Sequence, residues 1–283
     1  MTTALTAQEI RAWQRERLKT LLEMSPVSIG PSSVTIAVYH FWADEVFDAE
    51  FDYIEMAIRE TWQQFGLIKT VMIVNHASPR IERFHNQFPD WTRIDVCTDL
   101  KSGNLYTMSR DCIGMLHQRV DTDYIMYVHP DGWALRPGLE EFLGKYDCIA
   151  APWEIPARKH WVDKTLLRYG SDVGCGGFSL RSRKLFEIGA WYYRRRYKLI
   201  PDCFLIYEDI YFTKLLPTIE RLYRDVIRFA PLQTATEFSL NDNVALYEKT
   251  KTKPLGFHSY RAFSRLANDG HIDYPFGQRQ EVL

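Results

Sequence analysis

The sequence of 283 residues lacks several features that would assign it to a common class. Its five cysteines form no C-x-x-C pair, which argues against a structural zinc site and a disulfide framework and favours a reducing compartment. The formal net charge of -1 gives no overall electrostatic case for a nucleic-acid partner. No apolar run approaches the roughly 20 residues that a membrane-spanning helix needs, and the N-terminus lacks the order of a secretory signal. We therefore expect a cytoplasmic globular protein.

Two phosphate-binding motifs are also missing. No G-x-G-x-x-G follows the first predicted strand, and no P-loop lysine motif occurs anywhere in the chain. NAD-dependent enzymes and P-loop NTPases are therefore poor candidates.

Residues 1–33 predict an amphipathic helix followed by a linker. Thr6 and Glu9 form a T-x-x-E capping box, and apolar residues follow at helical spacing up to Met24. The basic residues of this helix leave a peripheral contact with a membrane surface open, but packing on the body of its own domain is the expected role. The segment 25–33, "SPVSIGPSS", has the composition of a linker.

From Val34 onward, short apolar runs alternate with helical patterns. Strands are predicted at 34–41, 70–75, 92–98 and 124–129. The helical patterns between them include one that ends at Gly66, one that begins at Ser78 and Pro79, and one from Asn104 to Gln118. This order predicts an α/β fold of the Rossmann-like type, whose mostly parallel sheet has helices on both faces.

The fourth predicted strand stops at Asp131, which lies between Pro130 and Gly132. Ligands of open α/β sheets bind beyond the carboxyl ends of the strands, so this aspartate is well placed to meet a metal or a phosphate. The alternative is that Asp131 only makes a turn, through a hydrogen bond between its side chain and the backbone.

Four later stretches decide between these interpretations. They are "YDCIAAPW" at 146–153, "GCGGFSLRSR" at 174–183, "YEDIYF" at 207–212 and "GFHSY" at 256–260. In this order and spacing they resemble the GT-A fold glycosyltransferases, above all a little-characterised family with D-Y-I-G-A-P-W, G-N-G-G-F-S-L-R and E-D-x-x-F signatures. The resemblance covers roughly residues 34–260. Cys148 and Cys175 depart from it, because that family often has Tyr and Asn there.

The resemblance implies one GT-A domain over 34–283, with a nucleotide-binding half at 34–153 and an acceptor-facing half at 154–283. It also implies a divalent cation, Mn²⁺ or Mg²⁺, that GT-A enzymes hold with an Asp-x-Asp motif and often with a later histidine. Asp131 and His258 match these two roles by position, and His129 stands in place of the first aspartate. A single carboxylate makes a weaker metal site, and His258 taken alone would be a structural histidine.

The same resemblance assigns donor binding to His129 and Asp131 and to four further positions. Gly176 and Gly177 would let the backbone approach a sugar or diphosphate closely, although a bulge or a tight turn is the structural alternative. His40 ends the first strand where a nucleobase docks in this class. Asn104 opens a helix that would touch the nucleotide.

Glu208 and Asp209 form the E-D pair. In many GT-A enzymes that invert the anomeric centre, the aspartate of such a pair deprotonates the acceptor hydroxyl, so we assign the base to Asp209, with Glu208 second. Taken alone, two carboxylates at a helix start only favour its N-terminus electrostatically.

The resulting interpretation is a glycosyltransferase that moves a sugar from a nucleotide-sugar to a hydroxyl group, in glycan or polysaccharide assembly. The acceptor is expected to be a glycan, a lipid-linked sugar or a small molecule. Two alternatives stay open. A sugar nucleotidyltransferase usually has a glycine-rich loop after the first strand, and "VYHFWADE" contains no glycine. A catalytically silent module that binds a nucleotide-sugar or glycan is the second.

Overall fold

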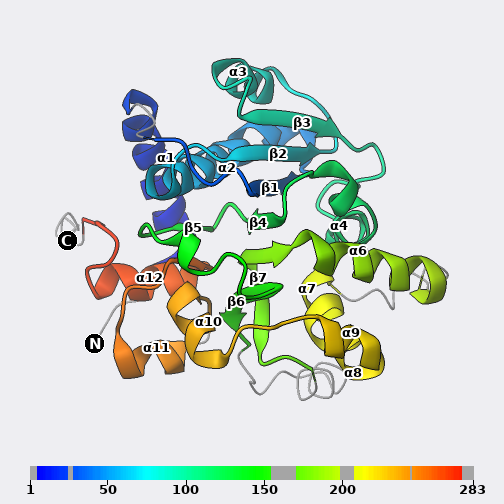
Figure 1. Ribbon diagram of the computed structural model, residues 1–283. Coiled ribbons are helices and arrows are strands. Elements are labelled where there is room, and N and C mark those ends of the chain that lie inside the picture. Colours follow the sequence, from blue (N-terminus) through cyan, green and yellow to red (C-terminus); the bar gives the residue numbers. More distant parts are fainter. Residues whose placement is uncertain (1–4, 25–27, 154–169, 198–206, 243, 276–283) are drawn as a thin grey trace.

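The computed structural model describes residues 5–24, 28–153, 170–197, 207–242 and 244–275. Its centre is a six-stranded sheet with the strand order β3-β2-β1-β4-β7-β6 (Figure 1). These strands are β1 (Val34–His40), β2 (Lys69–Val74), β3 (Thr92–Val96), β4 (Tyr124–Val128), β6 (Cys148–Pro152) and β7 (Val173–Ser182). Strands β1 to β4 pair in parallel, whereas β7 runs antiparallel to both β4 and β6. Among these six strands only β7 is therefore reversed, and the prediction of a mostly parallel sheet is confirmed.

Helices cover both faces of this sheet. Alternate residues of a strand point to opposite faces, and β4 shows this directly. Met126 belongs to a core cluster with side chains of α2 (Asp44–Phe65) and α3 (Pro79–Gln87). Tyr127 belongs to a second cluster with side chains of α4 (Leu105–Arg119) and α6 (Arg183–Tyr192). Every residue of β1 and β4 is buried, as expected of strands between two helical layers. The predicted α/β fold is confirmed.

The helix boundaries follow the local signals in the sequence. Ser78 caps α3 by accepting a hydrogen bond from the Ile81 N–H, and Pro79 takes the first helical position. Gly66 ends α2 with φ 79°, a conformation that glycine adopts without strain. Asn104 is the N-cap of α4. These boundaries confirm the predicted ones to within a residue or two.

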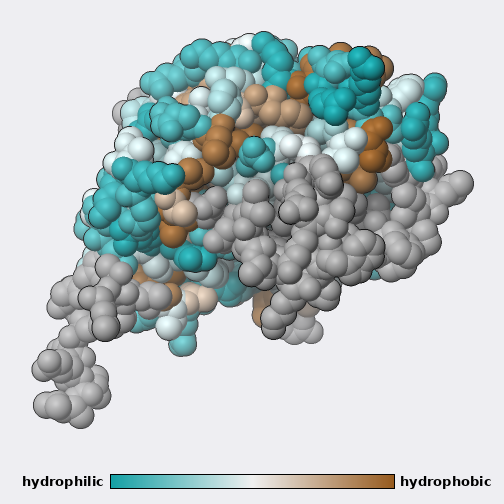
Figure 2. All heavy atoms as spheres, turned by 90° about the horizontal axis from the view of Figure 1, so that it is seen from below, coloured by the Kyte–Doolittle hydropathy of each residue, from teal (hydrophilic) through white to brown (hydrophobic). Residues whose placement is uncertain are grey.

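The N-terminal helix α1 (Ala7–Glu23) packs on the body of the protein (Figure 1). Its residues Ile10, Leu18 and Leu21 are buried, and the Trp13 ring stacks on the Trp133 ring with 5.9 Å between centroids. Other parts of the same chain therefore cover the apolar face of this helix, which confirms the expected packing. In the described ranges no helix is long and apolar enough to cross a membrane. On the face shown in Figure 2, hydrophobic residues form separate patches among hydrophilic ones.

A second, three-stranded sheet was not predicted. It has the order β5-β9-β8, formed by β5 (Gly132–Ala134), β9 (Gly256–His258) and β8 (Ser239–Leu240). β5 begins directly after Asp131 and runs antiparallel to β9, so that Gly132 pairs with His258. The last residue of β9 is thereby carried to the end of β4.

The remaining described helices come after β5 in the sequence. They are η1 (Leu139–Glu141), the π-helix η2 (Tyr193–Tyr197), α7 (Glu208–Ile210), the π-helix η4 (Tyr211–Leu215), α8 (Leu216–Ile219), α9 (Arg221–Val226), α10 (Leu232–Phe238), α11 (Val244–Thr250) and α12 (Tyr260–Asn268). In Figure 1, α10 to α12 lie on one side of β6 and β7, and α7 to α9 lie on the other side. The predicted division of the domain at residue 153 into two functional halves stays a prediction.

Candidate active site

Three potential metal ligands meet at the carboxyl end of β4. His129 and Asp131 follow this strand, His258 ends β9, and one ligand atom of each lies within 4.8 Å of the other two. The His258 Nε2 atom is 3.2 Å from Asp131 Oδ1, and these two side chains are 19% and 24% exposed. The rings of His129 and His258 meet edge to face with 5.1 Å between centroids. The three groups are therefore close together and only partly exposed to solvent.

The electrostatics of this cluster suit a cation. Burial opposes the charge of Asp131, but the nearby His258 outweighs this effect and lowers the pKa of Asp131 to about 2. Burial lowers the pKa of His129 to about 3, and the charge of His258 acts in the same direction. Burial also opposes protonation of His258, yet Asp131 raises the pKa of His258. At neutral pH the cluster thus offers the carboxylate of Asp131 and the neutral imidazole of His129, and a cation bound here would compete with a proton for the His258 ring nitrogen.

The backbone beside His258 is in a rare conformation. Ser259 has φ 101° and ψ 151°, a region that residues other than glycine seldom adopt. Its N–H donates to the Asp131 carbonyl at 3.0 Å, and its hydroxyl donates to Asp242 Oδ1 at 2.8 Å. The same hydroxyl accepts from the Ala262 N–H at the start of α12. These bonds fasten the end of β9 to the loop of Asp131 and so hold His258 in place.

Two consecutive glycines of β7 lie against the site. A Cβ atom at Gly177 would be 2.2 Å from Cδ2 of His258, and one at Gly176 would be 3.1 Å from Oδ2 of Asp209. Any side chain at position 177 would therefore overlap the His258 ring. His258 and Asp209 thus lie against neighbouring positions of β7. Asp209 accordingly contributes to raising the pKa of His258.

The carboxylate pair opens α7, and its two members differ in environment. Glu208 is only 4% exposed. The Ser109 hydroxyl donates to Glu208 Oε2 at 3.2 Å, and Arg181 Nη2 lies 3.7 Å from Oε1. Asp209 is half-buried, and burial together with the charge of Glu208 raises the pKa of Asp209 to about 7 in spite of Arg181. A carboxyl group with a pKa near 7 suits a general base at neutral pH.

Arg181 was not among the predicted site residues. It is fully buried in β7, and its three guanidinium nitrogens have no hydrogen-bond partner in the described ranges. Its guanidinium carbon lies 5.4 Å from the centre of the Tyr127 ring. Every second residue of a strand faces the same side of the sheet. The spacing from Gly177 through Ser179 to Arg181 could therefore have indicated that Arg181 lies on the same side as Gly177.

His40 and Asn104 have partners of their own. His40 is 1% exposed, and its Nε2 atom lies 2.9 Å from the Phe47 carbonyl oxygen. Burial lowers the pKa of His40 to about 4. The Asn104 side chain accepts hydrogen bonds from the N–H groups of Tyr106 and Thr107 and so caps α4. Both residues thus have structural tasks, and their contact with a nucleotide stays a prediction.

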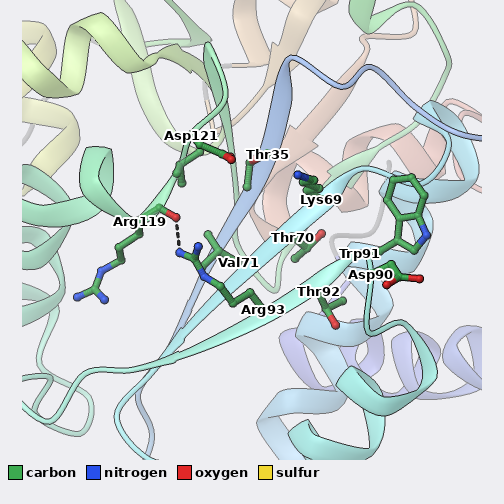
Figure 3. A pocket seen from close by; sticks show the side chains of 11 residues that line it. Thr35, Lys69, Thr70, Val71, Asp90, Trp91, Thr92, Arg93, Arg119 and Asp121 are labelled. Carbon is green, nitrogen blue, oxygen red and sulfur yellow. Dashed lines mark hydrogen bonds between the residues drawn. The ribbon is translucent and has the colours of Figure 1, made fainter.

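A pocket of about 210 Å³ lies at the amino ends of the strands, opposite the candidate site (Figure 3). Thr35, Lys69 and Thr92 line it at the starts of β1, β2 and β3. The cations Arg93 and Arg119 also line it, but they are engaged in ion pairs with Asp95 and Asp111. None of the predicted site residues lies in this pocket.

The sequence profile of a family described as "Protein of unknown function (DUF5672)" matches residues 100–258. This range includes the metal-ligand cluster, both glycines and the carboxylate pair. No curated protein matches the sequence.

Solved structures of several glycosyltransferases have a similar fold. The Streptococcus pneumoniae glycosyltransferase GlyE is 11% identical with a TM-score of 0.45, over 81% of this chain and 54% of that one. Core-mannan synthase A of Aspergillus fumigatus, in a Mn/GDP form, is 10% identical with a TM-score of 0.42, over 66% and 68%. The Pyrobaculum calidifontis mannosyltransferase PcManGT, in complex with GDP-Man and Mn²⁺, is 10% identical with a TM-score of 0.35, over 63% and 53%. The chain spans about half the length of the first and third, and the likeness concerns the fold alone.

Proposed function

The chain belongs to the DUF5672 family of proteins of unknown function, and we propose that it is a glycosyltransferase. It would move a sugar from a nucleotide-sugar donor to the hydroxyl group of an acceptor. The observation that carries this proposal is the meeting of two groups against Gly176 and Gly177, namely a set of cation ligands and a carboxyl group with a raised pKa. The reaction needs both, because a diphosphate must leave and a hydroxyl group must lose its proton.

The donor would bind beside His129, Asp131 and His258, which would hold a divalent cation. When bound, that cation neutralises charge on the diphosphate leaving group. Two imidazoles and one carboxylate suit a transition-metal ion such as Mn²⁺ better than Mg²⁺, which prefers oxygen ligands. The absence of a side chain at Gly176 and Gly177 would let the donor sugar approach the backbone of β7.

The acceptor hydroxyl would give its proton to a carboxylate oxygen of Asp209. The oxygen of the acceptor hydroxyl would form a bond to the anomeric carbon of the donor, while the bond from that carbon to the diphosphate oxygen breaks. The nucleoside diphosphate leaves with the electron pair. Glu208 and Arg181 adjust the pKa of Asp209 in opposite directions, since the glutamate raises it and the arginine lowers it. Such a direct displacement inverts the anomeric centre. We propose that the enzyme acts in glycan or polysaccharide assembly.

A binding experiment tests the donor site first. We expect calorimetry to detect at least one of GDP, UDP or their sugar conjugates, with higher affinity in Mn²⁺ than in Mg²⁺ or chelator. Asp131→Ala should weaken this binding about tenfold or more, because it removes the carboxylate ligand. Asp90→Ala, which changes an exposed aspartate at the amino edge of the sheet, should leave it unchanged.

The outcome is clear in either direction. The Asp131 side chain is 24% exposed, so its removal should leave the fold intact, and circular dichroism would verify this. Wild-type protein that binds no nucleotide in Mn²⁺ would overturn the proposal. An Asp131→Ala variant that binds nucleotides as well as wild type would show that the donor site is elsewhere. Donor binding without release of nucleoside diphosphate in the presence of any acceptor would indicate a silent binding module.

A further inference from the structure

Two exposed tyrosines lie directly outside the carboxylate pair. Tyr106 is the second residue of α4, and Tyr207 is the residue before Glu208. Their rings are stacked, with 5.7 Å between centroids and 7° between planes. The two residues are 38% and 40% exposed. A large part of this aromatic pair is therefore in contact with solvent.

Helix α4 connects the tyrosine stack to the carboxylate pair. Ser109 follows Tyr106 by three residues, so both lie on the same face of the helix. Ser109 donates to Glu208 Oε2 at 3.2 Å and accepts from the Glu208 N–H at 3.3 Å. The contact between α4 and α7 thus has a buried inner layer, Ser109 with Glu208, and an exposed outer layer, Tyr106 with Tyr207. The rise of about 1.5 Å per helical residue puts the outer layer about 4.5 Å further out along α4.

Local folding does not account for this exposure. Asn104 already caps α4 with its side chain, so the start of the helix is fixed without the tyrosine ring. Leu105, beside the stack, is also 45% exposed and enlarges the apolar surface. Aromatic side chains that stay partly exposed next to a functional group are typical of binding surfaces, because they offer large, rigid contact area together with a polar hydroxyl.

We propose that Tyr106 and Tyr207 bind a sugar unit of a carbohydrate acceptor. This inference rests on the proposed function, since it takes Asp209 as the base that the acceptor hydroxyl must reach. A pyranose ring has a face of C–H groups that packs on an aromatic surface, and its hydroxyl groups can pair with the phenolic oxygens. A sugar held on the stack would lie beside the carboxylate pair, because Tyr207 directly precedes Glu208.

Substitution of each tyrosine tests the stack. The probe is an array of defined oligosaccharides, and the full-length protein is loaded with Mn²⁺ and the nucleotide diphosphate that binds best. We expect wild type to bind at least one oligosaccharide, and Tyr106→Ala and Tyr207→Ala to bind it about fivefold or more weakly, as for a residue at the centre of an interface. The phenylalanine variants keep the ring and should retain most of the affinity. Trp191→Ala removes an aromatic residue of α6 with similar exposure and serves as the control.

Nucleotide affinity, measured in the same samples, separates this inference from the proposed function. Loss of oligosaccharide binding in the alanine variants with unchanged nucleotide affinity would support the tyrosine stack. Wild type that binds the nucleotide but no oligosaccharide would overturn it, and so would alanine variants that bind oligosaccharides like wild type. Protein that binds no nucleotide would instead overturn the proposed function.

Discussion

Replacing Asp209 with asparagine should stabilise the folded protein at alkaline pH while removing the proposed base. Burial and Glu208 raise the pKa of Asp209 from 3.8 to about 7. The folded state thus binds this proton more tightly than the unfolded chain does. The stability associated with it is complete below the unfolded pKa and is lost as the pH rises through the folded pKa. Asparagine cannot ionise and so avoids this loss.

The magnitude follows from the difference between the two pKa values. A difference of about 3 corresponds to about 4 kcal/mol in the free energy of unfolding once the pH exceeds both values. Asp209 keeps partial access to solvent, which screens its charge, so we expect about half of this effect. Asp209→Asn should therefore gain about 2 kcal/mol at about pH 8.5 and well under 1 kcal/mol at about pH 4.

Urea denaturation at both pH values measures this gain. The control is Asp90→Asn, because Asp90 is exposed at the far edge of the sheet and should respond little at either pH. A stability gain that grows with pH for Asp209→Asn alone would support a strained carboxylate retained for its chemistry. If Asp209→Asn were no more stable than wild type at about pH 8.5, the carboxyl group would not be perturbed and the assignment of the base would lose its physical ground.

Substitutions beside Asp209 and beside His258 should affect activity and metal binding separately. Glu208→Gln removes a charge that raises the pKa of Asp209, so the acidic limb of the pH–rate profile should move to lower pH, as initial rates of nucleoside diphosphate release would reveal. An unmoved limb would contradict this. Gly177→Ala puts a methyl group into the His258 ring and should weaken Mn²⁺ binding about tenfold or more by calorimetry. Gly114→Ala, whose methyl group has ordinary contacts in α4, should not; equal affinities would refute the argument.

The parallel part of the sheet could be predicted because its signals are local. Strands β1, β2 and β4 are short, mainly apolar runs, and β3 alternates polar and apolar residues. Each helix between them begins or ends at a capping residue such as Ser78, Asn104 or Gly66. These patterns extend over only a few residues, so they can be recognised in the sequence without knowledge of the tertiary structure.

The meeting of Asp131 and His258 could not be predicted from local patterns. It depends on β5 and β9, which have three residues each and are separated by more than a hundred residues of chain. Strands this short have no clear periodicity, and only the resemblance to a known family linked the two residues. Gly132 makes the pairing feasible, because a Cβ atom there would lie 2.5 Å from the Phe257 carbonyl oxygen.

Glu208 differs from what an acidic residue at a helix start leads one to expect. A favourable charge at a helix N-terminus is usually exposed and contributes about 0.3–1 kcal/mol. Glu208 is buried instead and faces the guanidinium group of Arg181 at 3.7 Å. Breaking a buried pair of this kind typically costs about 3–5 kcal/mol, so Glu208 belongs to the core of the site and not to its surface.

An irregularity in β7 explains how the two halves of the site come together. In a regular strand Gly176 and Gly177 would face opposite sides of the sheet, yet a Cβ atom at Gly177 would overlap His258 and one at Gly176 would be in tight contact with Asp209. The pairing between β6 and β7 shifts at this point, because Ala150 pairs with Ser179 whereas the next residue, Ala151, pairs with Cys175. Extra residues on one strand bend it and redirect its neighbours, as β-bulges do beside active sites. The bulge turns both glycines toward the site, so His258 and Asp209, which come from different elements, reach adjacent positions on one strand.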